Sequence, residues 1–535
     1  MYLRSIRIAN YRGIAEAEVT LEPVTLLLGE NDSGKSSILE ALSLILGAQE
    51  DRFEARLKAI HFHRGPTDAA GAMEIRLRFR EEAAGSWHPP DALASAIRSE
   101  HSSPRAMEFV FQATLDPITN GIHPSWFIDG KGAGPTLKDD AALLDWIRRL
   151  VPVLWLRSGL IALHATAGPA DPDLAAVERH YRNLITGETP DLFAELEQGV
   201  RAASAVIDRN PNLFAGTVPL LGAMAGDILN RQSSLQQAAG TPAASGAQKI
   251  GSILMLGAML QLIGREALPE SRPLLVLENP EANLHPATLA SVLRLVERIT
   301  WQKLISTNSG TLLTNAPLSA LRRLTRHGSK VRQWFVPPSV LSRDELRRLA
   351  YHVRSRRASA MFARCWLLVE GETEFWLLPE LARVLGYDFA AEGVVPVEFA
   401  QCGLRPLIKL AERLGIAWQL LTDGDDAGNH YAAEARKSDR RSGGTITQLT
   451  AQDIERCFWD NGFDDVIRRI AYPGSIPPKL SPKTTIRKAI ERTSKPFLAL
   501  SLIEAAGSRG PASVPAVLKS AILGCVAQAQ AAPRQ

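Results

Sequence analysis

Residues 29–36 read Gly29-Glu30-Asn31-Asp32-Ser33-Gly34-Lys35-Ser36, which fits the pattern GxxxxGK followed by Ser or Thr. The apolar run Val-Thr-Leu-Leu-Leu precedes this stretch, and a segment with helical spacing of apolar residues follows it. In such a strand–loop–helix setting, the loop N–H groups and the helix N-terminus bind nucleotide phosphates. Lys35 can reach the outer phosphates, and Ser36 can bind Mg²⁺. The predicted nucleotide-binding residues of the loop are Gly29, Asn31, Gly34, Lys35, Ser36 and Ser37.

A carboxylate for the nucleotide-bound metal follows a second buried strand. Residues 274–277 are apolar, and Glu278 comes directly after them. Because the carboxyl ends of parallel strands meet at one edge of a sheet, we expect Glu278 to hold Mg²⁺ together with Ser36. The next residue is Asn279, and an amide cannot act as a general base. We therefore expect slow ATP hydrolysis, or a base supplied by another group such as Glu281.

Two acidic clusters follow buried strands in the second half of the chain. Their sequences are Glu370-Gly-Glu-Thr-Glu374 after Cys-Trp-Leu-Leu-Val, and Asp423-Gly-Asp425 after Trp-Gln-Leu-Leu-Thr. Hard cations prefer oxygen ligands, and two cations about 3.5–4 Å apart can activate water and neutralise a leaving oxygen. Each cluster alone also fits a structural role, as helix-dipole stabilisation or a simple turn. Their pairing on two strand ends favours a metal site.

The apolar patterns divide the chain into two α/β parts. We predict one domain over residues 1–350, interrupted by a helical, alanine-rich insertion at about 170–245. A polar, arginine-rich stretch then leads into a second domain over residues 360–535, which ends in helices. A length of 535 residues agrees with this division, because single hydrophobic cores rarely serve so long a chain.

The composition is that of a globular protein, with 45% hydrophobic and 22% charged residues. No apolar run reaches the roughly 18–20 residues that a membrane-spanning helix needs, and the N-terminus lacks the apolar core of a signal peptide. We therefore expect a cytoplasmic location and no membrane partner. The four cysteines form no CxxC pair, which excludes a compact zinc ribbon. The net charge of +4 is too small to indicate nucleic-acid binding by itself.

The run Glu278-Asn-Pro-Glu-Ala-Asn-Leu-His285-Pro resembles the Walker B and D-loop segment of ABC-type ATPases, especially the SMC, Rad50 and RecF-like branch. That branch carries a helical segment between its two nucleotide-binding motifs. Its members close a signature sequence of one head on ATP held by another. Ser245-Gly-Ala-Gln248 is similar to this signature, which would make Ser245 a nucleotide-binding residue, but a helix N-cap serine is an equal interpretation. The resemblance implies a homodimer, with the insertion as the dimerisation region.

An ATPase of this type followed by a Toprim domain resembles the OLD (overcoming lysogenization defect) family of endonucleases, and class 2 most closely. The resemblance covers nearly the whole chain. It rests on the segments Phe362–Glu374, Gln401–Gly403, Asp423–Asp425 and Ser494–Pro496. It implies that the metal ligands are Glu370, Glu374, Asp423, Asp425 and Glu455. It also implies that Lys495 stabilises the charged transition state, with Glu372 and Asp426 as outer groups only.

The predicted fold class is therefore α/β: an ABC-type P-loop ATPase with a helical insertion, then a Toprim domain with a helical C-terminal extension. The implied function is that of an ATP-binding DNA endonuclease or nickase that uses Mg²⁺ or Mn²⁺. Two such ions would bind at the Toprim site, and ATP with Mg²⁺ would bind at the phosphate loop. A role in phage defence or DNA repair and a helicase-like partner fit this family. The alternative is a RecF-like, ATP-gated DNA clamp whose Toprim domain does not cut. Topoisomerase is disfavoured because no strand-transfer tyrosine domain is visible, and primase because the usual zinc module is missing.

Overall fold

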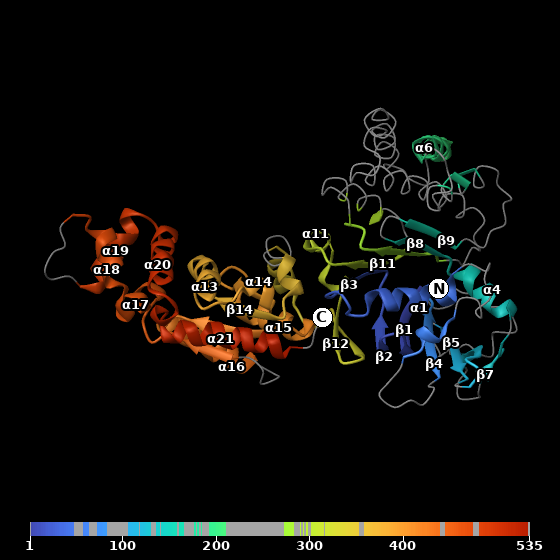
Figure 1. Ribbon diagram of the computed structural model, residues 1–535, viewed down its shortest axis with the longest axis horizontal. Coiled ribbons are helices and arrows are strands. Elements are labelled where there is room, and N and C mark those ends of the chain that lie inside the picture. Colours follow the sequence, from blue (N-terminus) through green and yellow to red (C-terminus); the bar gives the residue numbers. More distant parts are fainter. Residues whose placement is uncertain are drawn as a thin grey trace. The chain divides into compact units, whose positions relative to one another are not determined.

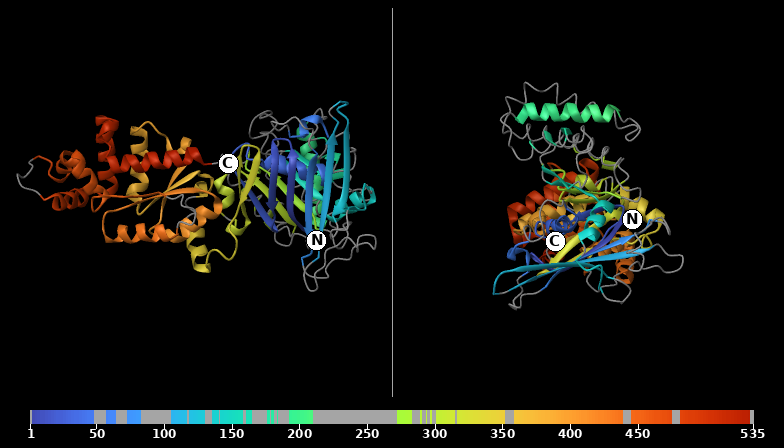
Figure 2. Two further views of the ribbon diagram at one scale, coloured as in Figure 1. Left: turned by 90° about the horizontal axis from the view of Figure 1, so that it is seen from below. Right: turned by 90° about the vertical axis from the view of Figure 1, so that its right-hand side faces the viewer.

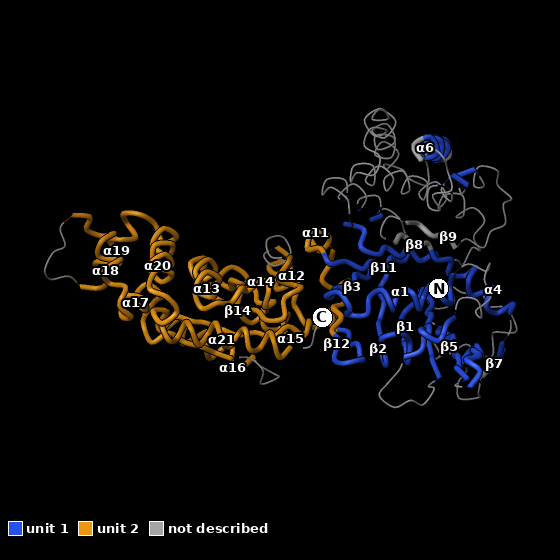
Figure 3. Tube along the Cα trace, viewed as in Figure 1, with its two compact units in different colours: residues 1–308, 326–333 blue, residues 309–325, 334–535 orange. Residues whose placement is uncertain are grey.

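The computed structural model forms two compact units, residues 1–308 with 326–333 and residues 309–325 with 334–535 (Figure 3). The structure describes residues 2–47, 57–63, 72–82, 105–116, 118–129, 135–139, 141–157, 160–164, 176–177, 179–180, 183, 192–209, 272–282, 289, 293, 296–297, 301–314, 316–351, 358–438, 445–474 and 481–532. Within these ranges no helix has the length and apolar character to span a bilayer.

One 13-stranded sheet runs through the first unit, and its first part is largely antiparallel, with alternating apolar and polar residues. Its strands follow the order β7-β6-β5-β4-β1-β2-β13. They are β1 (Tyr2–Tyr11), β2 (Ile14–Thr20), β4 (Met73–Arg80), β5 (Ala106–Leu115), β6 (Ile122–Asp129), β7 (Pro135–Thr136) and β13 (Lys330–Trp334). Figure 2 shows most of these strands side by side, in blue to cyan. In β4 the side chains of Met73, Ile75, Leu77 and Phe79 are fully buried, as expected when one face of a strand packs on a core.

The other part of this 13-stranded sheet is largely parallel and holds the phosphate loop. Its strands follow the order β3-β11-β10-β8-β9 and are parallel except for the β8–β9 pair. They are β3 (Val24–Leu28), β11 (Gln302–Thr307), β10 (Leu274–Glu278), β8 (Val153–Arg157) and β9 (Leu160–His164). Every residue of β10 is buried, which explains why its sequence is a continuous apolar run. Strand β12 (Leu321–His327) begins in the second unit and ends in the first.

The helices of the first unit include α1 (Lys35–Leu46), α4 (Ala141–Leu150) and α6 (Leu192–Arg209), with a short 3₁₀ turn η1 (Ala59–His61) (Figure 1). The predicted inner face of α1, which includes Ile38 and Leu42, is fully buried. Helix α6 lies in the predicted helical insertion, most of which is outside the described residues. Ser245 and the rest of the proposed signature also lie outside them.

The second unit is built on a parallel four-stranded sheet in the order β15-β14-β16-β17 (Figure 1). Its strands are β14 (Cys365–Val369), β15 (Val394–Glu398), β16 (Ala417–Thr422) and β17 (Thr445–Gln448). The helices between them are α13 (Glu372–Val384), α14 (Phe389–Glu392), α15 (Leu404–Leu414) and α16 (Asp426–Ser438). Strand β14 is completely buried, so the acidic residues that follow it mark the edge of the core.

Helices complete the second unit, as the sequence predicts for its last part. They are α17 (Ile454–Phe458), η5 (Trp459–Phe463), α18 (Asp464–Ala471), α19 (Pro482–Arg492), α20 (Lys495–Arg509), η6 (Pro511–Ser513) and α21 (Ala516–Ala531). Helix α21 contacts β14, β16 and β17. The shorter elements α11 (Gly310–Leu313), η2 (Leu318–Ala320), α12 (Arg343–Leu349) and η4 (Ala358–Phe362) lie before the sheet in sequence. Both units are thus α/β with a parallel core, as predicted.

Candidate functional site

Lys35 folds back onto the phosphate loop. Its Nζ donates hydrogen bonds to the carbonyl oxygens of Gly29 at 2.6 Å and Glu30 at 2.8 Å, and to Oγ of Ser33 at 3.3 Å. Burial lowers the pKa of Lys35 to about 8, although nearby carboxylates, Glu281 first, act in the opposite direction. A triphosphate in the loop would favour the charged form of this amine, because an opposite charge nearby raises a lysine pKa.

Gly34 allows the loop to turn into α1. Its φ of +99° is a left-handed conformation that favours glycine, and a Cβ there would lie 3.0 Å from the Val331 side chain. Asn31 and Ser37 lie beside this turn, at the tip of the loop and in the first turn of α1. The glycine requirement of the motif therefore has a steric cause in this protein.

The two predicted ligands of the nucleotide-bound Mg²⁺ meet in space. Oγ of Ser36, in the first turn of α1, donates a 2.6 Å hydrogen bond to Oε1 of Glu278 at the end of β10. The Glu278 side chain is almost fully buried, at 4% exposure, so the carboxylate is held in place. A hydroxyl and a carboxylate at this separation fit the oxygen ligands that Mg²⁺ prefers.

Glu281 lies at the same edge of the sheet as Asn279. Its Oε1 accepts hydrogen bonds from Thr307 Oγ1 at 2.9 Å and from the backbone N–H of Asn308 at 3.0 Å. Its Oε2 is buried and has no hydrogen-bond partner among the described residues. The amide of Asn308 in turn donates to Oδ1 of Asn31 in the phosphate loop at 3.1 Å. The only acid able to accept a proton in the segment 279–282 is therefore fixed beside the loop.

The two acidic clusters meet at one edge of the second sheet, which we call the carboxylate edge. Strands β14 and β16 are neighbours and parallel, with Leu368 opposite Leu420. Glu370 follows the first strand and Asp423 follows the second. The carboxylate edge comprises Glu370, Glu374, Asp423 and Asp425.

Two glycines allow close backbone contacts around the second acidic cluster. A Cβ on Gly428 would lie 2.0 Å from the carbonyl oxygen of Asp423, and one on Gly424 would lie 2.3 Å from that of Ala451. The N–H of Gly428 donates a 2.7 Å hydrogen bond to Oδ1 of Asp425. No larger residue fits at either position without movement of the backbone.

Burial and the repulsion between neighbouring acids both oppose ionisation at the carboxylate edge. Burial, and then the negative charges of Glu374, Glu370, Asp453 and Asp425, raise the pKa of Asp423 to about 7. Burial and the charge of Asp425 also raise the pKa of Glu370, and burial raises that of Glu374. Oε2 of Glu370 is buried and has no hydrogen-bond partner in the described part of the chain. A cation would relieve this repulsion, so the residues fit a divalent metal.

The carboxylates are close enough to interact, but their oxygens do not surround a common position that a metal ion could occupy. Across the ranges that the structure describes, no three acidic, histidine or cysteine side chains converge at metal-ligand spacing. Metal binding at the carboxylate edge would therefore require rotation of these side chains.

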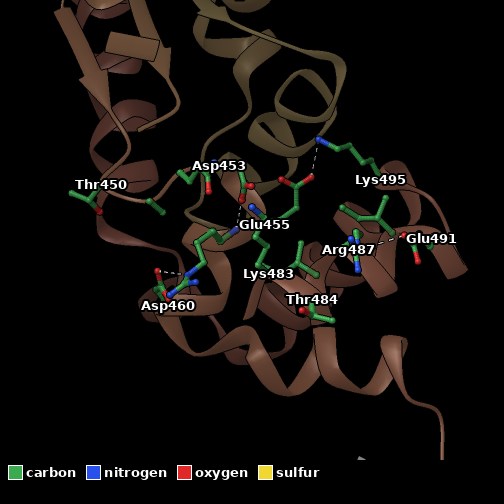
Figure 4. Close-up of a pocket in the computed structure, with 14 residues that line it drawn as sticks. Thr450, Asp453, Glu455, Asp460, Lys483, Thr484, Arg487, Glu491 and Lys495 are labelled. Carbon is green, nitrogen blue, oxygen red and sulfur yellow. Dashed lines mark hydrogen bonds and ion pairs between the residues drawn. The ribbon is translucent and has the colours of Figure 1, made fainter. Parts of the chain in front are cut away.

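Glu455 and Lys495 form an ion pair near this edge. Asp453 caps α17 by accepting a 2.7 Å hydrogen bond from the N–H of Arg456, which places Glu455 in the first turn. Nζ of Lys495, at the start of α20, lies 3.4 Å from Oε1 of Glu455 (Figure 4). Burial lowers the pKa of Lys495, but the charge of Glu455 and then of Glu374 outweighs it, so the pKa is raised. The structure thus brings both residues to one place.

Three features of this region have no motif in the sequence. Asp453 adds a negative charge near Asp423 beside those of Glu370, Glu374 and Asp425, and only its position in Asp-Ile-Glu could have drawn attention to it. A cavity of about 610 Å³ opens beside Glu455 and Lys495. Its wall includes Lys483 and Arg487 of α19, which sequence reasoning left unassigned.

The family model described as protein of unknown function (DUF2813) matches residues 1–360, and the model of the overcoming lysogenization defect protein-like TOPRIM domain matches residues 361–425. The uncharacterized protein YbjD of Escherichia coli (strain K12) is 34% identical over 574 aligned residues, which cover 97% of each chain. The C-terminal region of the Burkholderia pseudomallei OLD protein is 19% identical and covers 31% of this chain and 99% of its own, with a TM-score of 0.26. The SMC head domain from Thermotoga maritima is 14% identical and covers 63% of this chain and 100% of its own, with a TM-score of 0.33.

The predicted α/β fold class and the predicted OLD-like character of the Toprim part are both confirmed. The first rests on the P-loop between β3 and α1, on the parallel sheets of both units and on the TOPRIM match. The second rests on the match to residues 361–425, which contain the whole carboxylate edge. Because DUF2813 covers more than half of the chain and YbjD aligns with nearly all of it, the chain belongs to the DUF2813 family and carries an OLD-like TOPRIM domain.

Proposed function

We propose that the chain is an ATP-binding, metal-dependent DNA endonuclease or nickase. The carboxylate edge carries this proposal, because burial, and then the charges of several neighbouring acids, raise the pKa of Asp423 to about 7. Buried acids that repel one another are destabilising unless a cation joins them, so such a cluster is characteristic of a functional site. The match to an OLD-like TOPRIM domain over the same residues supports this proposal.

Five acids of this chain would hold two Mg²⁺ or Mn²⁺ ions: Glu370, Glu374, Asp423, Asp425 and Glu455. Bound there, the ions supply activation of a water molecule and neutralisation of the leaving 3′-oxygen. Lys495 contributes a fixed positive charge, which in this structure is paired with Glu455 at 3.4 Å. Its Nζ would stabilise the additional negative charge on the phosphate as the bond breaks.

The P-loop unit would bind ATP with Mg²⁺. Lys35 provides charge for the outer phosphates, while Ser36 and Glu278 hold the metal. Glu281, with one buried oxygen that has no partner among the described residues, would orient the attacking water in place of Asn279. We propose a cytoplasmic homodimer in which Ser245 of each chain closes on the other's ATP, with DNA as substrate, a role in phage defence or DNA repair, and a helicase-like protein as a partner.

A RecF-like DNA clamp is the second candidate. The observation that favours it is the absence of three converging ligands in the described ranges, because a site that binds one metal weakly could hold DNA without cutting it. In that case ATP would control DNA binding, and the carboxylate edge with its metal would hold the DNA without cutting it.

Plasmid nicking separates the two candidates. Supercoiled plasmid is incubated with the full-length protein and Mg²⁺ or Mn²⁺, with and without ATP, and open-circular and linear forms are quantified. We expect nicking by the wild type and by Glu504→Ala, which removes an exposed acid on α20 outside the site, but none by Asp423→Ala. DNA binding without cutting by all three proteins would establish the clamp. Equal cutting by Asp423→Ala would refute the proposed site.

A further inference from the structure

The cavity beside Glu455 has walls of opposite charge. One wall carries the acids Asp453, Glu455 and Asp460 together with Arg456, next to the carboxylate edge. The other wall, on α19, carries Lys483, Thr484 and Arg487 with one acid, Glu491, and Lys495 also lines the cavity (Figure 4). The cavity therefore joins the proposed cutting site to a basic surface.

Helix geometry explains the basic wall. Lys483 and Arg487 are four residues apart, so their side chains lie on one face of α19. Glu491, four residues further along, lies on the same face and leaves it with a net positive charge. Ser481 caps this helix by accepting a 3.2 Å hydrogen bond from the N–H of Thr484, which sets the start of the helix at the cavity. Positive helix-dipole potential adds to the charge of Lys483 at this end.

The cations of the basic wall are available to an anion. Arg487 pairs with Glu491 at 3.6 Å, but both side chains are more than 60% exposed, so the pair is weak and easily exchanged. Lys483 has no carboxylate within ion-pair distance in the part of the chain that the structure describes. Lys495 faces Glu455, and metal binding by Glu455 would free its ammonium group.

The size of the cavity limits what can occupy it. About 610 Å³ is within the range of roughly 300–1,000 Å³ that is typical of small-ligand sites. One or two nucleotides of a single strand fit such a space, whereas a duplex does not.

We propose that this cavity binds the phosphodiester backbone of one DNA strand next to the bond to be cut, with Lys483 and Arg487 as the phosphate contacts. Single-stranded or frayed DNA is then the preferred substrate. This inference rests on the proposed function, because it places the strand relative to the carboxylate edge.

Fluorescence anisotropy with the full-length protein tests the inference. The probes are fluorescein-labelled dT12 and its duplex with dA12, in Ca²⁺, over a series of salt concentrations. We expect tighter binding of the single strand. Arg487→Ala should raise its Kd several-fold and reduce the slope of log affinity against log salt by about 0.7, the value for one phosphate contact on a single strand.

The control is Arg492→Ala, which removes the same charge from the same helix at an exposed position outside the cavity. We expect it to leave Kd and the salt slope unchanged, and Arg487→Lys to retain much of the binding. Equal effects of Arg487→Ala and Arg492→Ala, no effect of either, or preference for the duplex would overturn the inference. Melting temperatures of all variants separate loss of binding from loss of folding.

The plasmid assay distinguishes failure of the strand-binding inference from failure of the proposed endonuclease function. Selective loss of dT12 binding in Arg487→Ala, without nicking by the wild type, would support the strand site and refute the endonuclease. Nicking that depends on Asp423, with no selective effect of Arg487→Ala, would refute the strand site alone.

Discussion

Asp423 must lose its proton before it can bind a cation, so we expect Mg²⁺ or Mn²⁺ to bind the carboxylate edge more weakly at pH 6 than at pH 8. The pKa of Asp423 is about 7, because burial and the charges of Glu374 and Glu370 oppose ionisation. About 90% of this carboxyl is ionised at pH 8 and about 10% at pH 6. This difference alone makes the apparent Kd for the metal about tenfold higher at pH 6 than at pH 8. Burial also raises the pKa of Glu370 and Glu374, so their ionisation acts in the same direction.

The stability of the metal-free protein changes with pH for the same reason. The pKa of Asp423 is higher in the folded state than the ordinary value of 3.8, so the folded state binds this proton more tightly. The resulting contribution to stability is fully present below about pH 4 and is lost as the pH rises through about 7. Added metal binds only the folded site, so it should raise Tm more at pH 8 than at pH 6.

Isothermal titration with Mn²⁺ and thermal melts, both without nucleotide, measure these effects at pH 6, 7 and 8. Asp423→Asn is the matched control, since it keeps the shape of the side chain and removes the titrating proton. We expect weaker Mn²⁺ binding by this variant and a shallower pH dependence. The reasoning fails if the wild type binds equally at pH 6 and pH 8, or if Asp423→Asn binds with the affinity and pH dependence of the wild type.

Four further substitutions test the other assigned roles. Lys35→Ala should abolish ATP turnover, because the phosphates lose their main side-chain charge; phosphate release measures this, and an unchanged rate would remove the phosphate-loop assignment. Glu281→Gln should slow ATP hydrolysis by roughly 10²–10⁴-fold with ATP binding retained, if Glu281 is the general base. Asn279→Glu should raise the rate, and a rate at or below that of the wild type would show that Asn279 does not occupy the usual position of that base. Lys495→Ala should slow plasmid nicking by roughly 10²–10³-fold while DNA binding persists, as expected for a preorganised transition-state donor.

Local patterns in the sequence predict the parts of the site that depend on backbone direction. The glycines around Lys35 and the apolar run before Glu278 are sufficient to expect a phosphate loop and a carboxylate at a strand end. The 2.6 Å contact of Ser36 with Glu278 follows from parallel strands sharing an edge, although 242 positions separate the two residues. The acids at positions 370 and 423 meet for the same reason.

Contacts between side chains of distant segments could not be predicted in this way. The orientation of the Glu281 carboxylate depends on hydrogen bonds from Thr307 and Asn308, whose positions are set by the order of strands in the sheet. The cavity wall depends on the face that α19 presents, and its charges look like ordinary surface residues in the sequence. No motif encodes such an arrangement, because it arises from packing and not from spacing.

Helix α21 has a consequence for synthesis of the chain. Its residues Leu518, Ala521, Ile522 and Cys525 are fully buried, and the helix contacts β14, β16 and β17. At about 5–20 residues per second, the ribosome needs roughly 8–30 seconds after β14 to reach this helix. During that interval the sheet lacks the apolar cover that α21 supplies, so the nascent second unit cannot acquire its final stability. The strands that position the carboxylate edge are thus made well before the helix that completes their packing, whereas the phosphate loop is made near the start of the chain.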